Sequence, residues 1–250
     1  MDQTQSGKWQ ESTNEAVRPY MVYSAGGLFM QDELTTNVLL KEAVWRLSKG
    51  KYEFFLPQSF ELQQIDRPDM ESFIRNKDLL NVLKSDIVLV RFDGLELESG
   101  TVVEFVFAKS LGKPTVILRC DFRRQSGTDR SEPYNLMAMN WPRTISVHLD
   151  SFRLWAEILS AERQAIGDWD NFQDNLRAEH STIQKSVDQI AVNVIAAMDQ
   201  AIDMDSPFPP DFQELVYRAS RYSPGSGFEE MLPEDELEAI IQNLRQNGTL

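Results

Sequence analysis

Residues 86–119 read DIVLVRFDGLELESGTVVEFVFAKSLGKPTVILR, with a short apolar run at each end and a longer helical segment between them. The runs Ile87–Val90 and Thr115–Leu118 are too uniformly apolar for strands with one face in water, and are typical of parallel strands covered on both faces. The segment Thr101–Leu111 is long enough for a crossover helix, and Gly112 stands where a C-terminal cap glycine is common. The stretch therefore predicts a parallel β-α-β unit.

The same alternation continues on both sides of this unit. Further apolar runs occur at Met21–Tyr23, Tyr52–Leu56 and Ile145–Val147, and further helical segments at Asp32–Leu47 and Met70–Leu83. Five strands with intervening helices predict an α/β fold, an open, doubly wound, five-stranded parallel sheet of the flavodoxin or Rossmann-like type.

Charge and periodicity change toward the C-terminus. Of the net charge of −14, residues 161–250 carry about −11. One helix face is indicated by Ile183, Val187, Ile190, Val194 and Met198, and a last helix by Pro233–Asn247. We therefore expect a flexible leader at residues 1–18, an α/β domain at 19–165 and an acidic helical extension at 166–250.

The composition disfavours several classes of function. An acidic chain lacks the cations that a nucleic-acid surface must supply. No stretch approaches the ~20 apolar residues of a membrane span, and the polar N-terminus has no signal-peptide centre, which favours a soluble, cytoplasmic protein. With a lone Cys120 and two separated histidines, His148 and His180, no zinc site is expected, whereas a carboxylate-bound Mg²⁺ stays open.

Two loops are candidate ligand sites, because open α/β sheets bind ligands beyond the carboxyl ends of their strands. The loop after Tyr23 contains Gly26 and Gly27, which let the backbone approach a ligand closely. The loop after Phe92 leads into residues 93–104, where mutual repulsion among four carboxylates is expected to raise some of their pKa values. The alternative is structural: the glycines make a turn, and the second loop makes a turn and a helix cap.

Glu104 is the residue of this segment that packing explains least. Its neighbours are Val102, Val103, Phe105, Val106 and Phe107. No Lys or Arg lies within one helical turn before it, and Lys109 is five residues on and off its face. Because burying an unpaired carboxylate is costly, we expect Glu104 to be paired with a cation or poised for chemistry.

Four elements, in order, resemble the nucleoside 2-deoxyribosyltransferase family across roughly residues 19–160. The loop Ala25-Gly26-Gly27-Leu28-Phe29 is similar to the family's Ala-Gly-Pro-Leu-Phe, and Asn76-Lys77-Asp78 with Lys84-Ser85-Asp86-Ile87-Val88 to its Asp-bearing helix and third strand. The segment Glu98-Ser99-Gly100-Thr101-Val102-Val103-Glu104, followed by Ala108 and Gly112-Lys113-Pro114, is similar to Asp-x-Gly-Thr/Ser-x-x-Glu and Gly-Lys-Pro. Pro133-Tyr134-Asn135-Leu136-Met137 is similar to the family's Asn-Leu-Met element.

The resemblance implies an enzyme of nucleoside salvage that moves 2-deoxyribose between nucleobases. It implies that Glu104 is the nucleophile of a double displacement through a glycosyl-enzyme ester, and that Asp78 protonates the departing base. The substrates would be 2-deoxynucleosides and free nucleobases, and no cofactor is needed.

The resemblance also implies where substrate binds. Glu98 would bind the sugar hydroxyls, and Asn135 would reach the sugar of a neighbouring subunit, which implies a homo-oligomer with shared sites. We expect Phe29 to stack on the base. Gly26, Gly27 and Asp93 are the other expected contacts.

Three departures and two alternatives remain. Glu98 replaces the family's Asp, Gly27 replaces its Pro, and the end of the acidic tail, from about Asp205, matches nothing in the family. One alternative is an N-glycosidase that cleaves 2-deoxynucleoside 5′-monophosphates with water, its phosphate held by the basic cluster Arg119, Arg123 and Arg124. The other is a non-catalytic nucleoside-binding module whose tail docks a partner.

Overall fold

The fold is known from a computed structural model, which describes residues 18–59, 68–121, 134–167 and 171–250. The expected leader lies almost wholly outside these ranges. Within them, no helix is both long and apolar enough to cross a lipid bilayer.

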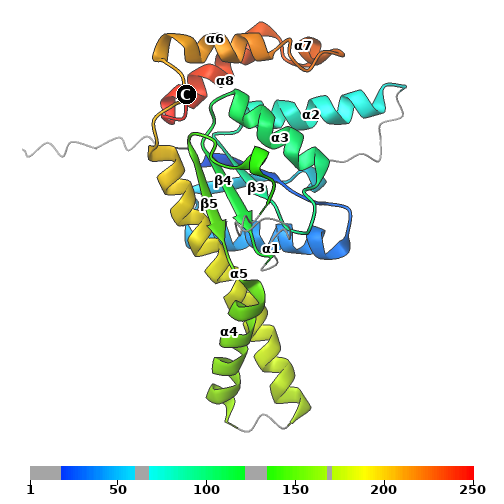
Figure 1. The fold of residues 1–250 in the computed structure, drawn as a ribbon, viewed down its shortest axis with the longest axis vertical. Coiled ribbons are helices and arrows are strands. Elements are labelled where there is room, and N and C mark those ends of the chain that lie inside the picture. Colours follow the sequence, from blue (N-terminus) through cyan, green and yellow to red (C-terminus); the bar gives the residue numbers. More distant parts are fainter. Residues whose placement is uncertain (1–17, 60–67, 122–133, 168–170) are drawn as a thin grey trace, which may run out of the picture.

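Five strands form one sheet in which every neighbouring pair is parallel (Figure 1). They are β1 (Tyr20–Ala25), β2 (Tyr52–Phe55), β3 (Ile87–Arg91), β4 (Thr115–Arg119) and β5 (Thr144–His148). Their order, β2-β1-β3-β4-β5, places the topological switch point between β1 and β3. The predicted doubly wound, five-stranded parallel sheet is confirmed.

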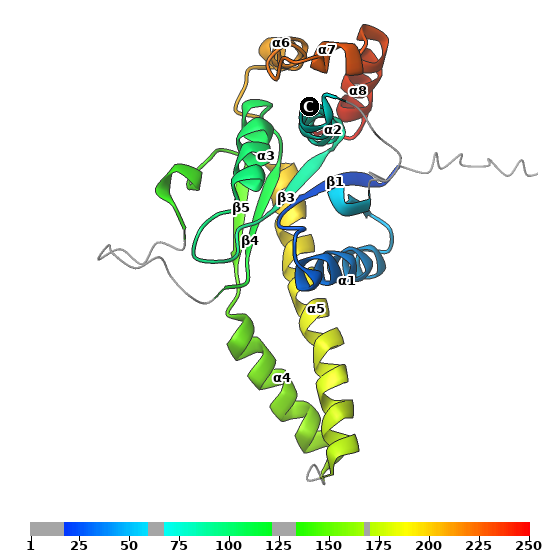
Figure 2. The ribbon, with the colours of Figure 1, turned by 90° about the vertical axis from the view of Figure 1, so that its right-hand side faces the viewer.

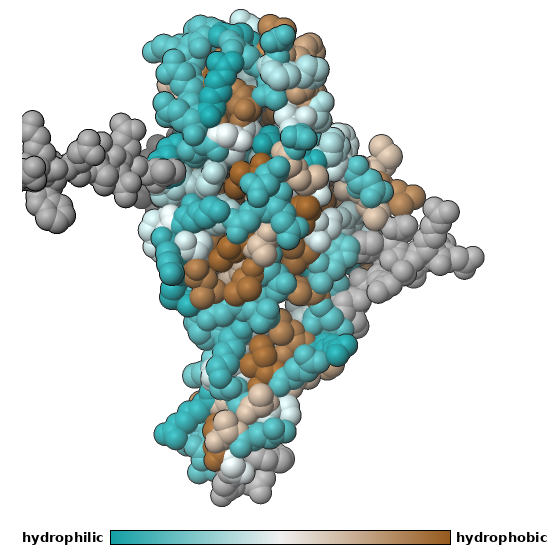
Figure 3. Space-filling view, turned by 90° about the vertical axis from the view of Figure 1, so that its left-hand side faces the viewer, coloured by the Kyte–Doolittle hydropathy of each residue, from teal (hydrophilic) through white to brown (hydrophobic). Residues whose placement is uncertain are grey.

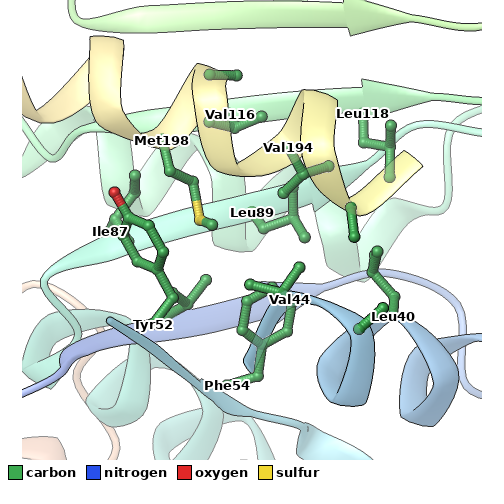
Figure 4. Close-up of a cluster of buried hydrophobic side chains, with 14 of the residues drawn as sticks. Leu40, Val44, Tyr52, Phe54, Ile87, Leu89, Val116, Leu118, Val194 and Met198 are labelled. Carbon is green, nitrogen blue, oxygen red and sulfur yellow. The ribbon is translucent and has the colours of Figure 1, made fainter. Parts of the chain in front are cut away.

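Helices cover both faces of the sheet (Figure 2). One face is covered by α1 (Gln31–Leu47) and α5 (Phe172–Asp203), and the other by α2 (Met70–Lys84) and α3 (Ser99–Ser110). Alternate residues of a strand point to opposite faces, so Leu89 joins the α1 and α5 core while Val88 and Val90 join the other. Figure 4 shows the first of these cores, where Val44 of α1, Leu89 of β3 and Val194 of α5 converge.

The N-terminal half of α5 leaves the sheet and pairs with α4 (Ser151–Ile166), and the two helices project beyond the body (Figures 1 and 2). Of the predicted α5 stripe, Val194 and Met198 are fully buried against the sheet, but Ile183 is 41% exposed because only α4 accompanies it. Figure 3 shows hydrophobic patches bordered by hydrophilic residues along this side of the molecule.

The C-terminal segment folds back over α2 and α3. It forms α6 (Pro210–Ser220), α7 (Phe228–Met231) and α8 (Glu234–Gln246), the last of which matches the predicted C-terminal helix. A third buried cluster joins these helices to the body, with members Leu79, Leu80, Leu83, Leu111, Tyr217, Phe228, Leu232, Leu237, Ile240, Ile241 and Leu244. The chain itself therefore covers the apolar residues of this cluster, whereas Phe212 and Leu215 of α6 stay half-exposed.

Gly112 ends α3 as predicted, with a φ of +70° that side chains other than glycine's rarely adopt. A Cβ there would also lie 2.9 Å from the ring of Phe208. We expect Gly112→Ala to lower the melting temperature by roughly 5 °C or more, since the left-handed conformation alone costs about 1–2 kcal/mol. The matched control is Gly248→Ala, which has a φ of +68° and open space around the position. Equal losses in the two variants would show that the Phe208 contact contributes nothing.

Candidate active site

Three side chains from three elements meet on the α2 and α3 face of the sheet, beside the switch point. Tyr23 of β1 is fully buried, and its Oη donates a hydrogen bond of 2.5 Å to Oε1 of Glu104 on α3. Asp78 of α2 lies close enough for its charge to raise the pKa values of both Glu104 and Tyr23. The two predicted catalytic residues are thus brought together, with a phenol beside them.

This environment perturbs all three pKa values. Burial raises the pKa of Glu104 to about 8; the Tyr23 hydrogen bond lowers it, and the charges of Asp78 and Glu98 raise it further. Burial raises the pKa of Asp78 to about 6. Burial, followed by the Glu104 charge, raises the pKa of Tyr23 well above its usual value. The site therefore holds two half-buried acids whose pKa values lie on either side of neutral pH.

The expected cause of these shifts was partly wrong. For Glu104 the largest cause is burial, and one of the two carboxylates that act on it, Asp78, lies outside residues 93–104. The pKa of Glu98 is not among those raised: burial raises it, but hydrogen bonds from Gly100 and Thr101 outweigh that effect and lower it. Backbone donors thus outweigh burial at Glu98.

Glu98 is the N-terminal cap of α3. Its carboxylate accepts hydrogen bonds from the backbone N–H groups of Gly100 (2.8 Å) and Thr101 (2.5 Å) and from the Thr101 hydroxyl (2.8 Å). Capping residues are normally shorter, so the extra methylene relative to the family's Asp is accommodated by folding the side chain back onto its own helix. The carboxylate stabilises the helix that carries Glu104.

The glycine loop after β1 is filled by side chains of the protein itself. A Cβ on Gly27 would lie 2.1 Å from the Glu33 carboxylate, which accepts hydrogen bonds from the N–H groups of Phe29 (2.8 Å) and Met30 (3.0 Å). A Cβ on Gly26 would lie 3.2 Å from Arg91. Phe29, the residue expected to stack on a base, is 76% exposed.

Asp93 joins the ends of two strands. Its Oδ1 accepts hydrogen bonds from the N–H groups of Cys120 (2.6 Å) and Asp121 (3.2 Å), beyond β4. Its Oδ2 forms an ion pair with Arg91 at 3.3 Å. The carboxylate thus fixes the loop after β3 to the loop after β4, which is a structural use of a residue expected to contact substrate.

Asn135 is not brought to Glu104 within one chain. It precedes the short helix η3 (Leu136–Ala138), and its Oδ1 accepts a hydrogen bond of 2.9 Å from the N–H of Met137. It lines a largely apolar cavity of about 670 Å³ together with Val102 and Val106. At 3.6 residues per turn, these valines lie on the opposite side of α3 from Glu104.

Of the basic cluster proposed for a phosphate, the structure describes only Arg119. Arg119 is buried, and its guanidinium donates hydrogen bonds to the backbone oxygens of Phe92 and Gly94. Arg123 and Arg124 lie outside the described residues. Across the described part of the chain, no group of three or more His, Cys, Asp or Glu side chains is arranged to hold a metal ion.

Tyr23 is the residue of this site that sequence reasoning missed. It was assigned only to a strand, yet a buried phenol needs a hydrogen-bond partner. A tyrosine on a strand that borders the switch point is therefore a usable signal for a polar site. Phe55 stacks on its ring at a centroid distance of 5.8 Å, which holds the hydroxyl in place.

Comparison with known proteins finds similarity in the α/β part of the chain. Residues 22–137 match the family model for nucleoside 2-deoxyribosyltransferases. Among solved structures, the chain is similar to a conserved protein from Enterococcus faecalis V583, at 25% identity and a TM-score of 0.43, covering 52% of this chain and 91% of that one. It is also similar to a 2-desoxiribosyltransferase from Leishmania mexicana, at 24% identity and a TM-score of 0.40, covering 54% of this chain and 93% of that one. A third similar structure is a 2-deoxyribosyltransferase from Bacillus psychrosaccharolyticus, at 20% identity and a TM-score of 0.39, covering 52% of this chain and 85% of that one.

No curated protein matches the chain. The family match covers the strands and helices that carry Tyr23, Asp78 and Glu104, and ends before α4. The resemblance to the nucleoside 2-deoxyribosyltransferase family is thus confirmed by the family model over residues 22–137.

Proposed function

We propose that this protein transfers 2-deoxyribose from one nucleobase to another, with Glu104 as the nucleophile and Asp78 as the acid. The observation that carries the proposal is the trio in which buried Tyr23 donates a hydrogen bond to half-buried Glu104 while the charge of Asp78 raises the pKa values of both. The family assignment of residues 22–137 supports the same activity. Buried acids with strongly shifted pKa values are typical of catalytic sites.

The reaction proceeds in two displacements. An Oε atom of Glu104 attacks the anomeric carbon, the bond to the base breaks with its electron pair on the base, and the Asp78 proton moves to a base nitrogen. The resulting ester is attacked by a nitrogen of the second base. Its proton returns to Asp78 and the carboxylate of Glu104 is released, so both residues regain their starting states.

The phenol of Tyr23 serves the first displacement. Its hydrogen bond stabilises the ionised form of Glu104, which is the nucleophilic form. Between about pH 6 and 8 the pKa values place the single proton of the pair mainly on Glu104, so the reactive form, with ionised Glu104 and protonated Asp78, is the minor one. The positive charge that develops on the sugar favours this form. The single proton of the pair is thus placed where the leaving base needs it.

This pair predicts a bell-shaped pH dependence. Below about pH 6 both acids hold protons and no nucleophile is present, and above about pH 8 both are ionised and no acid is present. We expect kcat/KM to fall on both sides of this window. In Tyr23→Phe, which loses the bond that lowers the pKa of Glu104, the alkaline limb should move to higher pH. A profile that stays flat across both limbs would contradict the assignment of the pair.

Asn135 is proposed to act in the site of a neighbouring copy. In its own chain it lies on the far side of α3 from Glu104, so only another subunit could bring its amide to this sugar. A homo-oligomer with shared sites follows from this placement and from the family resemblance.

The activity is tested by chromatography of thymidine or 2-deoxyadenosine incubated with the protein, with and without a second free base. The transferase forms a new deoxynucleoside only when the acceptor base is present. Free base that accumulates equally without an acceptor would instead indicate an N-glycosidase. If neither product forms, the binding-module alternative is favoured.

A further inference from the structure

Helix α2 lies between the candidate site and the C-terminal segment. Asp78 faces Tyr23 and Glu104, whereas Leu79, Leu80 and Leu83 are buried in the cluster formed with α6, α7 and α8. Figures 1 and 2 show these helices stacked on α2, on its side away from the sheet. Helix α2, which carries Asp78, is therefore packed on its outer side by C-terminal helices that lie outside the family match.

One polar contact ties the tail to α2 close to Asp78. Asn76 is only 1% exposed, and its Nδ2 donates a hydrogen bond of 2.9 Å to the backbone oxygen of Ser226. Ser226 lies in a turn in which Gly225, Ser226 and Gly227 have φ values of +62°, +50° and +79°. This turn directs the carbonyl of Ser226 toward the buried side-chain amide of Asn76. Asn76 precedes Asp78 by two residues and lies 150 positions before Ser226 in the chain.

The same part of the tail contacts α3. The rings of Phe107 and Phe228 pack edge to face at a centroid distance of 6.4 Å, and Phe107 lies three residues after Glu104. Leu111, just beyond the end of α3, belongs to the same buried cluster as Phe228. One short segment, residues 225–228, therefore contacts both helices that carry the two acids.

We propose that the turn at residues 225–228 positions Asp78 relative to Glu104, with Asn76 as the positioning residue that links the turn to α2. The proposal rests on the function proposed above. In this arrangement the C-terminal segment contributes no reacting group. It fixes the angle and distance at which α2 presents its acid to a base leaving from Glu104, a geometry to which reaction rates are sensitive.

The test compares Asn76→Ala and Phe228→Leu with a matched control. The control, Glu236→Gln, removes the tail's ion pair with Lys84, which joins the same helix at its far end (2.5 Å). We expect Asn76→Ala and Phe228→Leu to lower kcat by about 10-fold or more with KM changed by less than about twofold, and Glu236→Gln to change kcat by less than about twofold. If either Asn76→Ala or Phe228→Leu fails to fold, the other variant still tests the proposal.

A second readout does not depend on activity. Carbon-13 NMR of labelled aspartate follows the titration of Asp78, identified by its loss in Asp78→Asn. The titratable groups facing it are Tyr23 and Glu104, which no test variant alters. In Asn76→Ala the midpoint should fall below that of the native protein, because a loosened α2 admits water to a carboxyl whose pKa is raised by burial.

The outcomes separate the two proposals. Absence of base exchange in the native protein would overturn the proposed function, and a lowered Asp78 midpoint in Asn76→Ala would then still support the positioning contact. Folded Asn76→Ala and Phe228→Leu proteins with native kcat and an unchanged Asp78 titration would overturn the positioning role. An equal loss of kcat in Glu236→Gln would also overturn it, since the effect would not be specific to the turn.

Discussion

Replacing Glu104 with glutamine is expected to reduce base exchange by about 10⁴-fold or more, the scale on which loss of a catalytic nucleophile acts. Glutamine has the same shape, and its amide oxygen can still accept the hydrogen bond from Tyr23, but an amide does not form the ester. Glu96→Gln is the matched control, because Glu96 is an exposed glutamate that precedes α3. Exchange by Glu104→Gln at more than a tenth of the native rate would exclude Glu104 as the nucleophile.

Although Glu104→Gln is expected to lose activity, it is expected to be more stable than the native protein at alkaline pH. The pKa of Glu104 in the folded protein, about 8, lies above its usual 4.5, so its contribution to stability is fully present below about pH 4.5 and is lost as the pH rises through 8. Glutamine never ionises. Glu104→Gln should therefore melt several degrees above the native protein near pH 9, with the difference shrinking toward pH 5. A melting temperature that falls at both pH values would mean that glutamine disrupts the site.

Replacing Asp78 with asparagine is expected to slow exchange between natural bases by about 10²- to 10⁴-fold, the usual contribution of a positioned acid. The reason is that the base would leave without its proton. An aryl 2-deoxyriboside with a nitrophenolate leaving group needs no proton, so the variant should process it at close to the native rate. The measurement is release of nitrophenolate compared with exchange of thymidine. Equal losses with both donors would show that Asp78 has another role.

The periodicity of the sequence predicted the sheet because every strand is a short, uniformly apolar run between helical segments. All five strands lie within a residue or two of the predicted runs. Helices α4 and α6 were not predicted. Helix α4 does carry apolar residues at helical spacing, among them Phe152, Trp155 and Leu159, but none of its residues is buried.

Within the site, the sequence predicted which residues are functional more readily than it predicted the residues that contact them. Glu104 was identifiable because a lone carboxylate in an apolar helical segment needs an explanation. Its contact with Tyr23 depends on how α3 packs across β1, which no local pattern specifies. The same holds for Asn76 and Ser226, whose contact joins segments 150 residues apart.

Two predicted substrate contacts have structural partners that spacing could not reveal. Glu98 caps its own helix, and Asp93 links the loops after β3 and β4. Both are short-range consequences of backbone geometry, since the N–H groups at a helix start and beyond a strand end require acceptors. Their contact with a sugar remains a prediction.

The covalent role of Glu104 is tested most directly by mass spectrometry of the protein quenched with acid during reaction with a 2-deoxynucleoside and no acceptor base. We predict that the peptide containing Glu104 gains the mass of one 2-deoxyribosyl group, that added acceptor base removes it, and that Glu104→Gln never gains it. A 2-deoxyribosyl group on a different residue, or ready exchange with no modified peptide at any quench time, would contradict the mechanism.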